Sequence, residues 1–110
     1  MSKVYTIKAG DLLPAIEIYL VDCEGNPIDL TGFPDLRIVV APCIGGRRIV
    51  DMKPVVKDPE IPNKVTYAWA EGETDKPGKY LCEVRLTQAD SKEMTLPGAG
   101  YGEIVITPRL

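Results

Sequence analysis

The residue types that could do chemistry in this sequence are cysteine, the carboxylates and arginine, because the 110 residues contain no histidine. That absence removes histidine-based general bases, histidine-activated nucleophiles and the commonest zinc ligand. Cys23, Cys43 and Cys82 are widely spaced and form no Cys-x-x-Cys pair, so we expect free thiols and no disulfide. Cys82 is expected to act as a small buried hydrophobic residue.

Two acidic clusters are the next candidates. Asp22, Glu24 and Asn26 alternate like the start of a calcium loop, but no bidentate glutamate ends a twelve-residue loop, so a polar hairpin turn is favoured. Glu71 and Glu73 lie near Asp75, and this group is expected to be an exposed, solvated loop.

The arginine pair Arg47-Arg48 is a third candidate. The segment Gly45-Gly46-Arg47-Arg48 lacks the spacing and the lysine of a phosphate-binding loop. It predicts a hairpin whose arginines could contact the carboxylates of a partner. We therefore predict no catalytic, cofactor-binding or metal-binding residues, and no cofactor.

The elements that would position these residues are strands. Apolar residues alternate with polar ones over 16–20, 36–40, 65–69, 80–86 and 104–106, with turn residues between the runs. We count about seven or eight strands and no helix beyond a single turn at 71–75. The pattern predicts an all-β, two-sheet antiparallel sandwich with this core: Ile16, Ile18, Leu20, Ile38, Val40, Trp69, Val84, Leu86, Ile104 and Ile106.

A second pattern identifies the kind of sandwich. Asp75 and Gly78 precede Tyr80, which lies two positions before Cys82. This is the local pattern of the tyrosine corner in immunoglobulin-like sandwiches, in which the tyrosine hydroxyl bonds to backbone upstream. The four residues are predicted to form a structural corner in an immunoglobulin-like fold, with no disulfide opposite Cys82.

The length, the net charge and the hydrophobic pattern of the chain restrict its possible partners. The length fits one domain, residues 1–110. A net charge of −3 and no basic run longer than Arg47-Arg48 argue against nucleic acid. No apolar stretch has the length of a membrane helix, and the first residues lack the pattern of a secretory signal. We expect no membrane association and synthesis in the cytoplasm.

Three segments together resemble a known family, namely 5–32, 65–80 and 96–104. They are similar to the immunoglobulin-like domain at the N-terminus of phage baseplate upper proteins and in small prophage structural proteins. The resemblance implies a non-enzymatic assembly module of a tail, baseplate or head, made in the bacterial cytoplasm and incorporated into a virion. Its implied partners are other phage structural proteins and further copies of itself. Ser91 departs from the pattern, since it stands where a turn glycine is usual.

An alternative function is a module that binds carbohydrate or a cell-surface polymer through the loops or a face of the sandwich. That function predicts two or more exposed aromatic side chains on one face. The candidates are Phe33, Trp69 and the five tyrosines, and Trp69 is expected in the core.

Overall fold

The computed structural model describes residues 4–22, 24–97 and 102–110. These residues form an all-β fold with a single short 3₁₀ helix, as the alternating pattern predicts. The elements are β1 (Val4–Lys8), β2 (Ile16–Tyr19), η1 (Leu30–Gly32), β3 (Asp35–Ala41), β4 (Val50–Pro54), β5 (Val56–Lys57), β6 (Lys64–Tyr67), β7 (Gly78–Thr87), β8 (Glu93–Leu96) and β9 (Gly102–Thr107).

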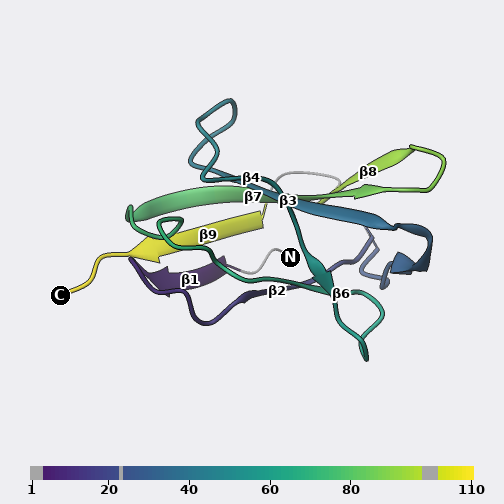
Figure 1. The fold of residues 1–110 in the computed structure, drawn as a ribbon, viewed down its shortest axis with the longest axis horizontal. Coiled ribbons are helices and arrows are strands. Elements are labelled where there is room, and N and C mark those ends of the chain that lie inside the picture. Colours follow the sequence, from purple (N-terminus) through teal and green to yellow (C-terminus); the bar gives the residue numbers. More distant parts are fainter. Residues whose placement is uncertain (1–3, 23, 98–101) are drawn as a thin grey trace.

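The larger sheet is built around β7, its longest strand (Figure 1). Its strands follow the order β1-β9-β7-β3-β4. One edge of β7 pairs with β3 from Asp35↔Thr87 to Ala41↔Leu81. The other edge is shared, because β9 pairs with the first half of β7 and β8 with the second half.

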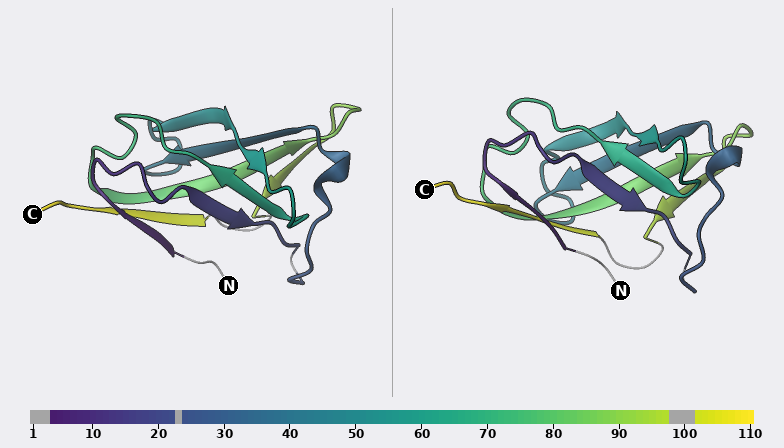
Figure 2. Two further views of the ribbon diagram at one scale, coloured as in Figure 1. Left: turned by 60° about the horizontal axis from the view of Figure 1, so that its bottom comes forward. Right: turned by 90° about the horizontal axis from the view of Figure 1, so that it is seen from below.

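The smaller sheet contains three strands in the order β2-β6-β5, and both of its pairings are antiparallel. Figure 2 shows it lying across the larger sheet as the second layer of a sandwich. An immunoglobulin-like domain places its second, fifth and fourth strands in one sheet and its third, sixth and seventh in the other. Here β2, β6 and β5 form the first group and β3, β7 and β9 the second, so the fold is an immunoglobulin-like sandwich.

One strand pair departs from the predicted antiparallel arrangement. β1 pairs with β9 in parallel, from Val4↔Glu103 to Lys8↔Thr107. The cause is the route of the chain, which leaves β1 and crosses to the other sheet to start β2. β1 therefore joins the larger sheet beside the last strand, running in the same direction, and the sheet is mixed.

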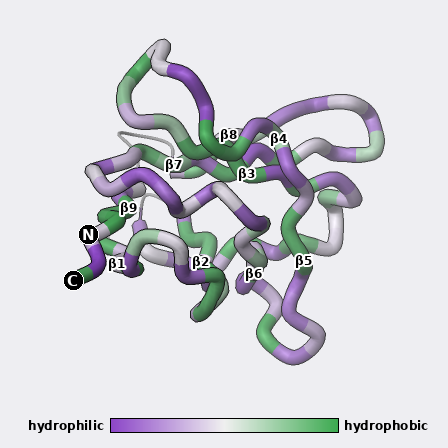
Figure 3. The backbone as a smooth tube through the Cα atoms, turned by 60° about the vertical axis from the view of Figure 1, so that its left-hand side comes forward, coloured by the Kyte–Doolittle hydropathy of each residue, from purple (hydrophilic) through white to green (hydrophobic). Residues whose placement is uncertain are grey.

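The interior consists of two packed groups of apolar side chains. Of the ten residues predicted for the core, all except Ile18 are buried. Ile18 is half-buried and contacts both groups, because β2 lies at the edge of its sheet. Trp69 is buried although it lies beyond the end of β6. Figure 3 shows hydrophobic and hydrophilic stretches following one another along the chain.

The turns follow the chemistry of their residues. The hairpin predicted at Gly45-Gly46 joins the antiparallel pair β3 and β4, and Pro54 ends the edge strand β4. Ser91 has a φ of 73°, the left-handed conformation expected where the turn lacks a glycine. Residues 71–74, where a single helical turn was the best helical candidate, form a turn and no helix. The short 3₁₀ helix η1 was not predicted. Within the described ranges, no helix is long and apolar enough to cross a membrane.

Candidate functional site

The predicted corner lies where the chain enters β7. Tyr80 is buried, and its hydroxyl donates a hydrogen bond of 2.7 Å to the carbonyl oxygen of Lys76. Gly78 has a φ of 151°, which disfavours residues with a side chain. Asp75 is exposed and Cys82 is half-buried. Burial raises the pKa of Tyr80, so the phenol keeps its proton and remains a donor to the loop.

Glu73 is not the exposed loop residue that the acidic cluster predicts. Its side chain is buried and accepts hydrogen bonds from the Tyr67 hydroxyl at 2.7 and 2.9 Å and from the Ala70 amide at 2.7 Å. The Lys53 ammonium donates to it at 2.6 Å. The turn at 71–74 directs this carboxylate inward, where three donors, from Tyr67, Ala70 and Lys53, satisfy the charge and the tyrosine hydroxyl finds its acceptor.

The contact with Glu73 also affects the pKa of Tyr67. Burial, and then the hydrogen bond to Glu73, raise the pKa of Tyr67 far above its ordinary value. The carboxylate is fully used in holding Tyr67, Ala70 and Lys53 in place. Glu71 and Asp75, the other two members of the predicted cluster, are exposed. The acidic cluster is therefore a structural crosslink around one buried carboxylate, with its other two members exposed.

Further hydrogen bonds join the loops at the end of the sandwich where Glu73 lies. The Trp69 indole donates to the Tyr5 hydroxyl at 3.3 Å, and that hydroxyl donates to the Pro14 carbonyl oxygen. The hydroxyl of buried Thr74 donates to the Asp11 carbonyl oxygen at 2.8 Å. These bonds attach the crossover between β1 and β2 to the loop between β6 and β7. We call this region the closed end; it comprises Tyr5, Pro14, Tyr67, Trp69, Glu73, Thr74 and Tyr80.

The candidate calcium turn has a structural use. One carboxylate oxygen of Asp22 accepts hydrogen bonds from the amides of Glu24 and Asn26, both at 2.9 Å. These backbone donors lower the pKa of Asp22 and commit that oxygen to the turn. Across residues 4–22, 24–97 and 102–110, no three cysteine, aspartate or glutamate side chains come together in a way that could hold a metal ion.

The two cysteines that the structure describes are both free thiols. Cys43 is exposed and Cys82 is half-buried, whereas Cys23 lies outside the described residues. Burial raises the pKa of the Cys82 thiol to about 11, and the Glu83 carboxylate adds to the effect. Cys82 is therefore protonated at neutral pH and is a poor nucleophile.

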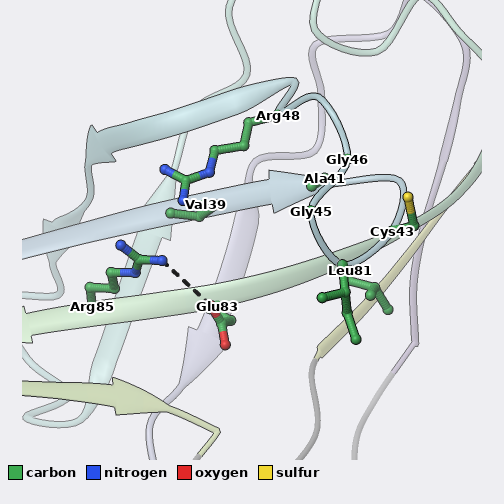
Figure 4. A pocket seen from close by; sticks show the side chains of 10 residues that line it. Val39, Ala41, Cys43, Gly45, Gly46, Arg48, Leu81, Glu83 and Arg85 are labelled. Atoms are coloured by element: carbon green, nitrogen blue, oxygen red, sulfur yellow. Dashed lines mark ion pairs between the residues drawn. The ribbon is translucent and has the colours of Figure 1, made fainter.

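A shallow pocket of about 360 Å³ lies beside the Gly45-Gly46 hairpin, over the outer face of β3 and β7 (Figure 4). Arg48 and Arg85 extend over it in Figure 4. Each has a carboxylate neighbour of its own: Arg48 contacts Asp51 at 2.6 Å, and Arg85 lies 3.9 Å from Glu83. The predicted contact with a partner concerned Arg47 and Arg48, and for Arg48 it would compete with the internal ion pair to Asp51.

A larger groove of about 490 Å³ runs along β2. Its lining is mostly apolar and comes from β2 in the smaller sheet and from β1, β7, β8 and β9 in the larger sheet. We call it the β2 groove; its apolar and aromatic lining comprises Val4, Tyr5, Ile16, Ile18, Tyr19, Leu20, Val21, Cys82, Val84, Leu96, Pro97 and Ile104.

The charged residues of the β2 groove are all acidic. Glu17, Glu83 and Glu103 line it, and none of its described lining residues is basic. Lys64 lies 3.2 Å from Glu17, outside the lining, and covers the Tyr19 ring at 5.6 Å. Sequence periodicity indicated which side chains of β2 face inward. It carried no signal for the groove, because the lining residues come from strands of both sheets.

The comparisons with known proteins support the fold. The sequence matches no protein-family model and no curated protein. In structure the chain is similar to "The crystal structure of CopC from Methylosinus trichosporium OB3b", with a TM-score of 0.57 and 14% sequence identity. The match covers 99% of this chain and 88% of that chain. At this identity the likeness establishes a shared β-sandwich architecture and nothing about function.

Proposed function

We propose that this protein is a non-enzymatic binding module that assembles with other proteins, and that its partners are structural proteins of a phage or prophage particle. The observation that carries the binding role is the β2 groove, an apolar channel that contains half-buried Ile18 and exposed Tyr19 and Val21. Contiguous exposed apolar surface with a charged rim is typical of protein interaction sites.

The choice of partner class rests on the sequence. The three segments that resemble the phage baseplate and prophage domains include the strand that borders the groove (β2), the corner at Tyr80 and the start of β9. A virion component is repeated around a symmetry axis, so self-association is part of the same proposal.

The test uses the products of the genes that flank this one. Each product is co-expressed with the protein, and the mixture is analysed by size-exclusion chromatography with light scattering. We expect a discrete complex of defined stoichiometry with a tail, baseplate or head protein. A protein that stays monomeric at high concentration and binds no flanking gene product would contradict the proposal.

Carbohydrate binding receives less support from the described aromatic residues. Phe33, Tyr67, Trp69 and Tyr80 are buried, and Tyr5 is half-buried with its hydroxyl bonded. Tyr19 is the one exposed aromatic ring among the residues that the structure describes, and Tyr101 lies outside them. A single ring does not supply the paired aromatic platform that this function predicts.

A further inference from the structure

The pocket beside the Gly45-Gly46 hairpin is lined by two arginine side chains that approach it from different strands. Arg48 follows the hairpin just before β4, and Arg85 lies on β7, on the other side of β3. In Figure 4 both guanidinium groups extend toward Val39, which lies on β3 between them. The fold thus brings two positive groups, far apart in the sequence, to one small site.

Val39 indicates that these arginine side chains are packed. Its neighbours Ile38 and Val40 point into the core, so Val39 points outward, away from the smaller sheet. It is nevertheless only 7% exposed. Arg48 and Arg85 line the same pocket, and the aliphatic part of an arginine shields apolar surface while its guanidinium group stays near water. Side chains that are already packed lose less conformational entropy when a ligand binds.

Both guanidinium groups retain hydrogen-bond donors for a ligand. Arg48 donates to Asp51 at 2.6 Å through one terminal nitrogen, and its other nitrogens are not engaged by that bond. A terminal nitrogen of Arg85 lies 3.9 Å from the Glu83 carboxylate, which is longer than a hydrogen bond. A guanidinium group carries several N–H donors in a planar fork, so each arginine can donate to an anion in the pocket.

The lining of the pocket defines the ligand that fits. Its charged residues are Arg48, Arg85 and Glu83, so positive charge exceeds negative charge. Guanidinium groups bind carboxylate and phosphate oxygens through paired hydrogen bonds. The lining also contains apolar Leu81 and Ile44, and Ile44 is 75% exposed. Exposed apolar surface beside two arginines favours an acidic peptide segment, which carries an anion and apolar groups together, over a small inorganic anion.

We propose that this pocket binds an acidic side chain of a partner protein, with the carboxylate held between the guanidinium groups of Arg48 and Arg85. An apolar residue next to that acid packs against Leu81 and Ile44. The contact predicted at the hairpin thus involves Arg48 together with Arg85, whereas Arg47 is exposed outside the lining. The inference rests on the proposed binding function and specifies the chemistry of a partner segment on the outer face of β3 and β7.

The experiment uses the whole protein and two short labelled peptides of equal length. In the first, leucine alternates with glutamate; in the second, leucine alternates with glutamine. Fluorescence anisotropy measures the affinity of each. We expect saturable binding of the glutamate peptide and binding of the glutamine peptide at least about tenfold weaker. Equal binding of the two, or no binding of the glutamate peptide, would overturn the inference.

Matched arginine variants locate the site. Arg48→Gln and Arg85→Gln each remove one guanidinium group of the pocket, and each should weaken glutamate-peptide binding by roughly tenfold. Arg47→Gln removes the same charge from the same hairpin outside the lining, and should weaken binding by less than about twofold. Equal losses for Arg47→Gln and Arg48→Gln would indicate diffuse attraction by the basic hairpin and contradict a defined pocket. Unchanged binding by both pocket variants would also contradict it.

Variants of the internal acids should have the opposite effect. Glu83→Gln and Asp51→Asn each release an arginine from a carboxylate that competes with the ligand. We therefore expect each to strengthen binding of the glutamate peptide by about threefold. Weaker or unchanged binding in both variants would mean that the ligand does not compete for these arginines, and would contradict the inference.

Nuclear magnetic resonance of the arginine Nε–H groups gives a measurement on the unaltered protein that does not depend on how a variant folds. The glutamate peptide should shift the signals of Arg48 and Arg85, and it should leave the signal of Arg109, which lies outside the lining, in place. Inorganic phosphate is the second probe. If phosphate shifts the two pocket signals and the peptide does not, the occupant is a free anion and the assignment to a partner segment is overturned.

The outcomes also separate this inference from the proposed function. A stable complex with a flanking gene product that survives when Arg48→Gln and Arg85→Gln are combined would retain the assembly role and reject the pocket as its site. Glutamate-peptide binding at the pocket without any flanking partner would retain the pocket and reject the virion role.

Discussion

The closed end and the β2 groove are two stretches of the same sandwich in which the two sheets meet differently. At the closed end, hydrogen bonds of side chains tie the sheets and their connecting loops together: Tyr67 donates to Glu73, Trp69 to Tyr5, and Tyr80 to Lys76. At the β2 groove, half-buried Ile18 and Cys82 face an open channel with an unpaired strand edge within the described chain. The two regions adjoin at Tyr5, and the difference shows how hydrogen bonds can hold one part of the sandwich together while the neighbouring part keeps apolar surface accessible.

The largest expected effect comes from removing the buried carboxylate of the closed end. Glu73→Ala leaves the buried Tyr67 hydroxyl without its acceptor and removes the bonds to the Ala70 amide and Lys53, so we expect a loss of about 3 kcal/mol in the free energy of unfolding. Urea denaturation measures this loss. Glu71→Ala is the matched control, because Glu71 is exposed and its removal should change the free energy by less than about 0.5 kcal/mol. Equal midpoints for the two variants would mean that the closed end does not depend on Glu73.

The next largest effect is a difference in reactivity between the two cysteines that the structure describes. Iodoacetamide at pH 8 should modify Cys82 on the order of ten times more slowly than Cys43, because burial raises the pKa of Cys82 to about 11 and keeps it protonated, whereas Cys43 is exposed. The Cys82 rate should rise with pH up to that value. Mass spectrometry of time points measures both rates. Cys82 reacting as fast as Cys43 would mean that the floor of the groove is more open than the structure indicates.

A smaller loss should follow from cutting the corner bond. Tyr80→Phe removes the hydroxyl that donates to Lys76 and leaves that carbonyl oxygen without this donor, which should cost about 1–2 kcal/mol. Tyr19→Phe serves as the control, because Tyr19 is exposed on the groove side. An unchanged urea midpoint for Tyr80→Phe would show that the corner contributes no stability.

The smallest effect is expected at the groove itself. Val21→Thr replaces an exposed apolar side chain and should change the free energy of unfolding by less than about 0.5 kcal/mol, because the folded chain packs little against it. Thermal denaturation followed by circular dichroism checks this. A loss above about 1 kcal/mol would show that the groove wall is part of the core and would weaken the contrast with the closed end.

The alternation of apolar and polar residues predicted burial correctly wherever one face of a strand is covered. Ile38, Val40 and Leu86 are fully buried because they lie on the two central strands β3 and β7, flanked on both sides. The same pattern overestimated the burial of Ile18, because the parity of a side chain does not reveal whether its strand lies at a sheet edge. The prediction that Glu73 is exposed was also wrong: an acidic residue in a turn is usually solvated, but this one is buried.

The sequence by itself determined the sandwich, its turns and the residue types of its interior, because a period of two and turn residues act locally. Only the tertiary structure decided that β1 runs parallel to β9, that Glu73 is buried and accepts a hydrogen bond from Tyr67, and that β2 forms an edge of its sheet, within the described residues, beside an apolar groove. These features depend on which sheet each strand joins. The sheet that a strand joins depends on pairing and burial across the whole chain. It therefore cannot be predicted from a short window of neighbouring residues.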